Sequence, residues 1–92
     1  MYLDIGRYGG LAETADEFIR YRLRSARSGP TGPVILAGPT CDSSDILYAH
    51  LPYDLPWSLE TGDRLDILGA GAYTSSYASS FNGVMPLTTY CL

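Results

Sequence analysis

The chain has 92 residues, of which 46% are hydrophobic and 12% aromatic, and its formal net charge is -4. This length allows one small domain, and the composition is typical of a folded chain rather than a disordered one. The negative charge argues against a nucleic-acid partner, and no apolar run approaches the roughly 18 residues needed to cross a membrane.

The contents of cysteine and lysine limit the chemistry further. Residues 1–4 lack the basic flank and apolar region of a secretory signal, so we expect a soluble, cytoplasmic protein. Two cysteines, Cys41 and Cys91, allow one disulfide, but in that compartment free thiols are expected. All six basic residues are arginines, so no side chain of this chain can form a Schiff base.

The N-terminal residues predict a short strand, a bend and a short helix. Apolar residues at 2, 3 and 5 favour a strand that runs into the glycine-rich residues 6–10. That bend resembles a phosphate loop only superficially, because no strand-loop-helix unit of proper length surrounds it and no Lys-Ser/Thr follows it. Asp4 is either a turn former or a polar group aimed at a site. Residues 11–19 predict one or two helical turns, with Thr14 and Glu17 spaced as in a capping box.

The period then changes from helical to alternating. Ile19, Tyr21 and Leu23 alternate with three arginines, which predicts a half-exposed strand. The arginine face is a solvated surface, a guard against edge-to-edge pairing, or an anion or partner site. Residues 25–33 are rich in glycine, proline and serine and are expected to form a loop.

The apolar run at residues 34–37 predicts a buried strand, and Gly38-Pro39-Thr40-Cys41-Asp42-Ser43-Ser44-Asp45 follows it. Gly38-Pro39 ends the strand, so the thiol of Cys41 and the carboxylate of Asp42 lie on a loop, where both can face one cavity. A thiol can exchange a proton, and a carboxylate can bind a cationic group. The alternative is a polar turn that contains a cysteine.

The remainder of the chain predicts short elements. Residues 46–48 form a brief apolar piece, and residues 50–56 are a proline-broken connection. The single histidine, His50, has no second histidine or nearby cysteine to make a zinc site. A turn leads into a strand around residues 65–68, residues 75–80 favour a short helix, and residues 87–92 favour a final strand. The fold class is therefore mostly β, a small antiparallel sandwich or Greek-key barrel of about six to eight strands with one or two short helices.

Several motifs occur together in a consistent order, namely the octet at residues 38–45, Gly62-Asp63, Gly71-Ala72-Tyr73-Thr74 and Phe81-Asn82-Gly83. Together they resemble the C-terminal β-domain of ornithine/lysine decarboxylases, which depend on pyridoxal phosphate and have the alanine-racemase-like fold type. Residues 2–11 are similar to the start of that domain in bacterial members. The resemblance extends over almost the whole chain, residues 1–92.

The resemblance implies specific roles. Cys41 stands where the family's cysteine protonates the substrate Cα after carbon dioxide leaves. Asp42 stands where an acid pairs with the substrate's distal amino group, and Asp4 matches a second such acid less closely. Tyr73 matches a tyrosine that contacts the cofactor phosphate, and Phe81 an aromatic near the substrate. Diaminopimelate decarboxylases usually have glutamate after the cysteine, so aspartate here favours a simple diamine product.

Ordinary chemistry agrees with these roles. A cysteine thiol with the usual pKa near 8.5 is largely protonated at neutral pH and can act as an acid. An ionised aspartate attracts a distal ammonium group. The family's barrel domain, which carries the Schiff-base lysine, is missing, so the resemblance implies that this chain alone is inactive.

Two explanations of the missing barrel domain remain open. The chain is either a separate small subunit that docks on a TIM-barrel subunit or a fragment of a longer product. For a separate subunit, the expected assembly is a heterotetramer. Met1 at the domain start favours the first. Other functions also remain open: a regulator that binds the dimer interface of a full-length decarboxylase, or a different pyridoxal-phosphate reaction in a specialised biosynthetic pathway.

Overall fold

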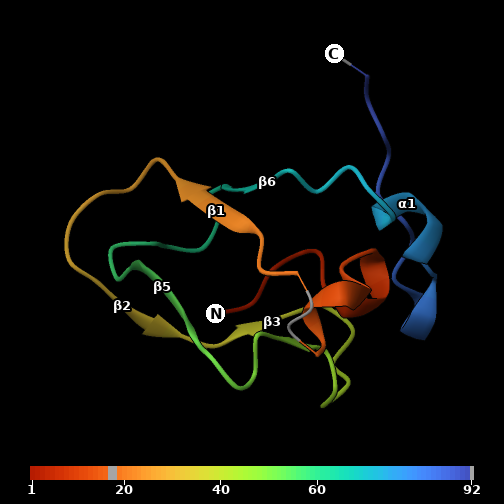
Figure 1. The fold of residues 1–92 in the computed structure, drawn as a ribbon, viewed down its shortest axis with the longest axis horizontal. Coiled ribbons are helices and arrows are strands. Elements are labelled where there is room, and N and C mark those ends of the chain that lie inside the picture. Colours follow the sequence, from red (N-terminus) through yellow and green to blue (C-terminus); the bar gives the residue numbers. More distant parts are fainter. Residues whose placement is uncertain (17–18, 92) are drawn as a thin grey trace.

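A computed structural model describes residues 1–16 and 19–91 (Figure 1). Three two-stranded antiparallel sheets make up the β structure. They pair β1 (Arg22–Ser25) with β6 (Leu65–Leu68), β2 (Thr31–Val34) with β5 (Tyr53–Pro56), and β3 (Leu36–Ala37) with β4 (Ile46–Leu47). The helical elements are α1 (Thr74–Tyr77) and three 3-10 turns, η1 (Arg7–Gly9), η2 (Ala12–Thr14) and η3 (Phe81–Gly83). This confirms a mostly β, antiparallel fold with few short helices, and the described strands do not close into a barrel.

Within the described part of the chain, the buried hydrophobic core consists of Leu11, Tyr21, Leu36, Leu47, Tyr48 and Leu55. Tyrosine hydroxyl groups connect β1 to the neighbouring sheets. The Tyr53 hydroxyl accepts from the N–H of Leu23 at 3.1 Å and donates to the carbonyl of Tyr21 at 2.9 Å. The Tyr48 hydroxyl accepts from the N–H of Tyr21 at 2.9 Å. Backbone groups beside β1 are therefore satisfied by side chains where no strand pairs with them.

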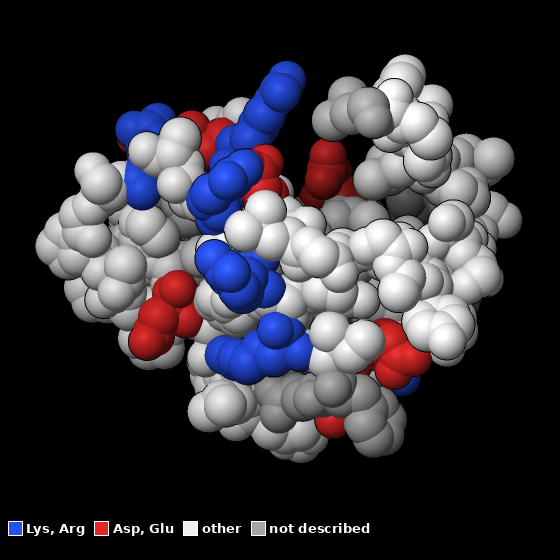
Figure 2. Space-filling view, turned by 45° about the horizontal axis from the view of Figure 1, so that its top comes forward, with Lys and Arg blue, Asp and Glu red and all other residues white. Residues whose placement is uncertain are grey.

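The predicted alternating strand is confirmed at β1, although it begins at Arg22 rather than at residue 19. Leu23 is half-buried opposite Ile67, while Arg22 and Arg24 are exposed. Because the chain has no lysine, every blue side chain in Figure 2 is an arginine, and these side chains form a row along one face. Arg24 bonds Asp66 across the β1–β6 pair at 2.7 Å, so part of the row is neutralised locally.

The segments predicted as loops at residues 25–33 and 50–56 are partly strands, which corrects both predictions. β2 begins at Thr31 and pairs with β5 despite a proline in each strand. Proline is tolerated there because each strand has only one partner in its sheet. Gly32 lies against the indole of Trp57, where a Cβ atom would come within 2.3 Å of the ring.

The apolar run at residues 34–37 is divided between β2 and β3, with Ile35 between them 60% exposed. Leu36 is only 1% exposed, so the run is not buried throughout as predicted. The physical reason is a change of partner, since β2 pairs with β5 and β3 with β4.

Two further predictions about elements are only partly confirmed. The strand at residues 2–5 is reduced to one bridge between Tyr2 and Ala37. The helix at residues 11–19 is reduced, in its described part, to η2, where the Thr14 hydroxyl donates to the Leu11 carbonyl instead of capping a helix start. The capping partner Glu17 lies outside the described residues.

The predicted final strand does not form, because residues 84–91 have no strand partner among the described residues. β-propensity without a neighbouring strand does not make a sheet. Instead the C-terminal end of this segment leads away from the rest of the molecule (Figure 1). Met85, Leu87 and Tyr90 on it are 71%, 58% and 81% exposed. Within the described part of the chain, no helix is long and apolar enough to span a membrane.

Candidate functional site

Residues 38–45, here called the site loop, connect β3 to β4. The two ends of the loop are joined, since the N–H of Gly38 donates to the carbonyl of Asp45 at 2.9 Å. A second bond inside the loop runs from the N–H of Asp45 to the carbonyl of Asp42 at 3.0 Å. The octet is therefore a closed connection at the end of a strand pair, as the sequence predicted for its position.

The carboxylate of Asp45 anchors the site loop from inside. Asp45 is 1% exposed and accepts from the Thr40 hydroxyl at 2.7 Å, the Arg7 N–H at 2.8 Å and the Thr40 N–H at 3.3 Å. A Cβ atom on either Gly6 or Gly38 would come within 2.4 Å of this carboxylate. Both glycines are therefore required by the close approach of Asp45, and together they fix the loop against the N-terminal residues.

Cys41 has a left-handed backbone, with a φ of 63°, which is uncommon for a residue other than glycine. It is exposed, and among the described residues its thiol makes one long contact, of 3.9 Å with the carbonyl of Pro39. A non-glycine residue in this conformation is characteristic of functional sites, where the surrounding structure maintains the strain. Cys91 is also free and exposed.

Asp42 is half-buried and held by Ser44, two residues further on. One oxygen, Oδ1, accepts both the Ser44 N–H, at 2.8 Å, and the Ser44 hydroxyl. These bonds, the hydroxyl first and the N–H second, lower the pKa of Asp42, and the charge of Arg7 adds slightly while desolvation opposes them. The carboxylate is therefore ionised at neutral pH.

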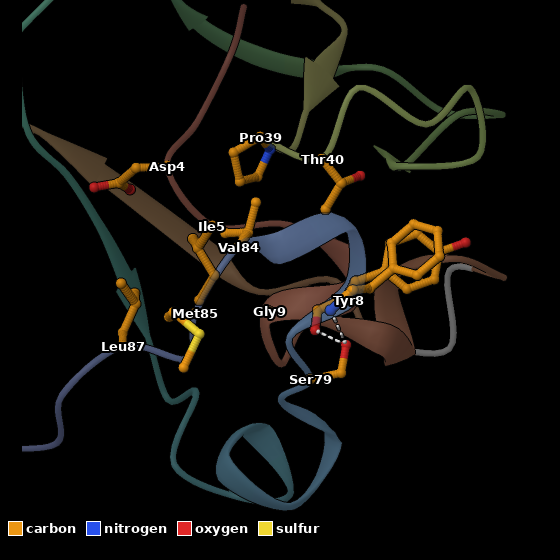
Figure 3. A pocket seen from close by; sticks show the side chains of 11 residues that line it. Asp4, Ile5, Tyr8, Gly9, Pro39, Thr40, Ser79, Val84, Met85 and Leu87 are labelled. Atoms are coloured by element: carbon orange, nitrogen blue, oxygen red, sulfur yellow. Dashed lines mark hydrogen bonds between the residues drawn. The ribbon is translucent and has the colours of Figure 1, made fainter.

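Phe81 reaches the site loop through aromatic stacking. Its ring lies 4.2 Å from that of Tyr8 between centroids, at an interplanar angle of 26°. The Tyr8 hydroxyl is 2.6 Å from the Ser44 hydroxyl, and the Asn82 amide donates to the carbonyl of Thr40 at 3.0 Å. The N–H and the hydroxyl of Ser79 each donate to the Tyr8 carbonyl at 2.9 Å, and these bonds hold the residues just before η3 in place. The hydroxyl contact is visible in Figure 3.

Asp4 and Phe81 both line a small pocket beside the site loop, but Asp4 lies across this pocket from Tyr8, on which Phe81 stacks (Figure 3). Its other walls are mostly apolar, formed by Ile5, Tyr8, Gly9, Pro39, Thr40, Ser79, Val84, Met85 and Leu87. The cavity volume is only about 10 Å³, too little for an amino acid. The lining includes neither Cys41 nor Asp42, so Asp4 and Phe81 line one pocket but do not share a cavity with the thiol.

Tyr73 lies apart from these groups, at the start of α1. It has a left-handed backbone with a φ of 65°, and its residue is 64% exposed. Its ring lies 5.8 Å from that of Tyr77, whose hydroxyl donates to Glu13 at 3.1 Å. That acceptor raises the pKa of Tyr77. Tyr73 is therefore presented to solvent on a turn that is held against η2.

Sequence reasoning located the thiol and carboxylate but missed the groups that hold them, namely Asp45, Ser44, Tyr8 and Asn82. The signal for Asp45 was available only in part. Gly6 and Gly38 are glycines because one carboxylate fills the space beside both. Nothing in the sequence states that positions 6, 38 and 45 meet.

Comparisons with known proteins identify the family of this chain. Residues 1–71 match the family model described as "Pyridoxal-dependent decarboxylase, C-terminal sheet domain". A probable ornithine decarboxylase of Dictyostelium discoideum is 37% identical over 97% of this chain, which corresponds to 19% of that protein.

Solved structures are similar as well. The crystal structure of lysine/ornithine decarboxylase from Vibrio vulnificus complexed with cadaverine matches with a TM-score of 0.84 and 37% identity, over 99% of this chain and 24% of the other. A diaminopimelate decarboxylase (I148L mutant) from Helicobacter pylori complexed with L-lysine has a TM-score of 0.76 and 31% identity, over 94% and 21%. The chain thus spans about a fifth to a quarter of the length of these relatives.

Proposed function

This chain belongs to the pyridoxal-dependent decarboxylase family as its C-terminal sheet domain, and from that premise we propose that it forms one side of a decarboxylase active site. The proposed substrate is ornithine, lysine or a related basic amino acid. A barrel domain, in a separate subunit or elsewhere in a longer polypeptide, completes the site. As a separate subunit, the chain forms a heterotetramer with its barrel partner.

The observation that carries the proposal is the site loop, in which an exposed thiol adjoins a carboxylate held ionised by Ser44. In the proposed reaction the Cys41 thiol donates its proton to the substrate Cα, and solvent then returns a proton to the sulfur. Asp42 accepts the distal ammonium group of the substrate and so fixes its far end. Both groups act from the surface, as one side of a site between two domains requires.

Pyridoxal phosphate, when bound, supplies the electron sink that takes up the charge left at Cα as carbon dioxide departs. This chain offers that cofactor only a part of its site. The exposed hydroxyl of Tyr73 makes no hydrogen bond within the described residues and is free to meet a phosphate oxygen. Because the chain contains no lysine, the Schiff-base lysine comes from the barrel domain.

Two further residues complete this side of the site. Phe81, stacked on Tyr8, offers an apolar wall for the methylene chain of the substrate. Asp4 is exposed and assigned to the distal amine as a second acid. The Vibrio vulnificus enzyme was crystallised with cadaverine, a diamine, and that ligand supports a diamine as the product here.

Reconstitution tests the proposal. The chain is mixed with a barrel polypeptide of this family that lacks its own sheet domain, together with pyridoxal phosphate, and carbon dioxide and diamine are measured for ornithine, lysine and diaminopimelate. We expect activity only in the mixture. Cys41→Ala is expected to lower kcat by about 100-fold or more, as loss of a positioned acid does. Cys91→Ala, the matched control, is expected to leave kcat unchanged.

Other outcomes would reject this function. Equal activity of the barrel polypeptide without the chain, or full activity of both Cys41→Ala and Asp42→Ala mixtures, would overturn it. Loss of activity when the chain is added to an intact decarboxylase would indicate a regulator at the dimer interface instead. A product other than the diamine would indicate a different pyridoxal-phosphate reaction.

A further inference from the structure

The strongest unassigned feature of the site is a series of hydrogen bonds and one aromatic stack that together link two of its proposed substrate-binding residues, Asp42 and Phe81. Ser44 occupies the centre of that series. We propose that Ser44 is a positioning residue, which fixes the Asp42 carboxylate in one orientation and couples it through Tyr8 to Phe81. The effect of Ser44 on substrate binding rests on the proposed function, whereas its hold on the Asp42 carboxylate does not.

The direction of each hydrogen bond follows from the chemistry of the groups. An ionised carboxylate only accepts, so the single proton of the Ser44 hydroxyl is donated to Oδ1 of Asp42. The Tyr8 hydroxyl, 2.6 Å from the same serine oxygen, must then be the donor to Ser44. Tyr8, Ser44 and Asp42 thus form one ordered series, in which each bond polarises the next.

The series is supported at Ser44, its central member, and at Tyr8. The Arg7 guanidinium donates to the Ser44 carbonyl at 3.1 Å, and its carbon lies 5.8 Å from the centre of the Tyr8 ring. The Ser79 bonds to the Tyr8 carbonyl hold the backbone of Tyr8. With these residues fixed, Asp42 and Phe81 share one rigid support although they lie 39 residues apart in the sequence.

The consequence is a preorganised site for the far end of the substrate. A free aspartate rotates about its side-chain bonds and must be immobilised when it binds an ammonium group. Ser44 holds Asp42 before binding, with one oxygen occupied by the serine and the other, Oδ2, in no hydrogen bond within the described residues. We assign the free oxygen to the distal ammonium group, and Phe81 to the methylene chain beside it.

The first test measures the Asp42 carboxyl by carbon-13 NMR titration in the 92-residue chain itself. Charged or titratable neighbours are Arg7, Tyr8, Asp45 and Cys41, and none is altered in the main variant. We expect Ser44→Ala to raise the pKa of Asp42 towards its ordinary value, since the principal cause of its lowering is removed. Ser44→Thr, which retains the hydroxyl, is expected to preserve the low pKa. Ser43→Ala, at an exposed serine without a hydrogen bond among the described residues, is the matched control.

The second test measures kinetics in the reconstituted complex. Ser44→Ala is expected to raise KM about three- to tenfold with kcat changed less than about twofold, because binding rather than proton donation is weakened. The acid limb of kcat/KM should also move to higher pH. Tyr8→Phe, which keeps the ring but removes the donor, should shift both quantities in the same direction by less.

The outcomes separate the two proposals. An unchanged pKa of Asp42 in Ser44→Ala and Tyr8→Phe would overturn the positioning role. A raised pKa without activity in any reconstituted mixture would support that role and overturn the proposed function. Equal KM values for Ser44→Ala and Ser43→Ala in an active complex would overturn the assignment of Ser44 to substrate binding.

Discussion

The site loop and the turn at residues 60–63 each contain an aspartate whose pKa is lowered, but the causes differ. Asp42 accepts from a serine hydroxyl and a backbone N–H. Asp63 accepts first from the Arg27 guanidinium, with 2.9 Å from Nε to Oδ2, and then from the N–H of Glu60 at 2.8 Å. Asp42 is therefore held by two uncharged donors of Ser44, whereas Asp63 is held chiefly by the long, charged side chain of Arg27.

The difference shows how each turn is built. The turn at Asp63 is held mainly by a surface ion pair between Asp63 and Arg27. Salt screens this pair, and both side chains must be ordered to form it. The site loop is organised around Asp45, a buried carboxylate bonded to the backbone of Arg7 and to Thr40. Buried hydrogen bonds are not exposed to counterions, so the site loop keeps its geometry under conditions that loosen the other turn.

The largest expected effect is that of removing the anchor of the site loop. Asp45→Ala leaves three donors without their acceptor in a buried place, and we expect it to lower the free energy of unfolding by about 3–5 kcal/mol. Urea denaturation of the full chain, followed by circular dichroism, measures this loss. Asp54→Ala, at an exposed aspartate of β5, is the control and is expected to change stability by less than about 0.5 kcal/mol. A loss below about 1 kcal/mol in Asp45→Ala would contradict the role of the anchor.

A smaller effect is expected from crowding the same carboxylate. In Gly38→Ala the new Cβ would lie 2.4 Å from both oxygens of Asp45, which must therefore move. We expect a loss of about 2–3 kcal/mol, typical of overpacking a closed site. Gly71→Ala is the matched control, because a Cβ there meets nothing within 4 Å. Equal stability of the two variants would show that the close approach at Gly38 is unimportant.

These two regions also differ in how far the sequence revealed them. Gly62-Asp63 was predicted as a turn into a strand, and β6 follows at Leu65, because the turn and its strand are local features. The position of Cys41 and Asp42 at a strand end was likewise predicted from the apolar run and Gly38-Pro39 before them. Local patterns suffice where a residue's neighbours in sequence determine its conformation.

The rest depends on contacts between distant residues. Tyr8 and Ser44 are 36 residues apart, and their bond exists only after the site loop closes on the N-terminal residues. β5 was missed because the prolines at 52 and 56 indicated breaks, whereas Pro52 lies before the strand and Pro56 is accommodated at its end, in a sheet of two strands. The final strand was predicted from residue preferences alone, which cannot show that residues 84–91 have no partner strand among the described residues.

The smallest expected effect is a difference in how the pKa values of Asp63 and Asp42 respond to salt. At Asp63 the folded pKa is lowered, so its ion pair stabilises the fold above the unfolded pKa of about 3.9 and loses that contribution as pH falls through the folded value. Screening by 0.5 M NaCl, or Arg27→Gln at low salt, should therefore raise the pKa of Asp63 towards its ordinary value. The N–H of Glu60 still donates, so the pKa should remain below that value.

Under the same salt the pKa of Asp42 should move less, because its donors carry no net charge, and one NMR titration measures both carboxyl groups. A shift at Asp42 as large as that at Asp63 would mean that charge, from Arg7, and not Ser44, holds the carboxylate of the site loop.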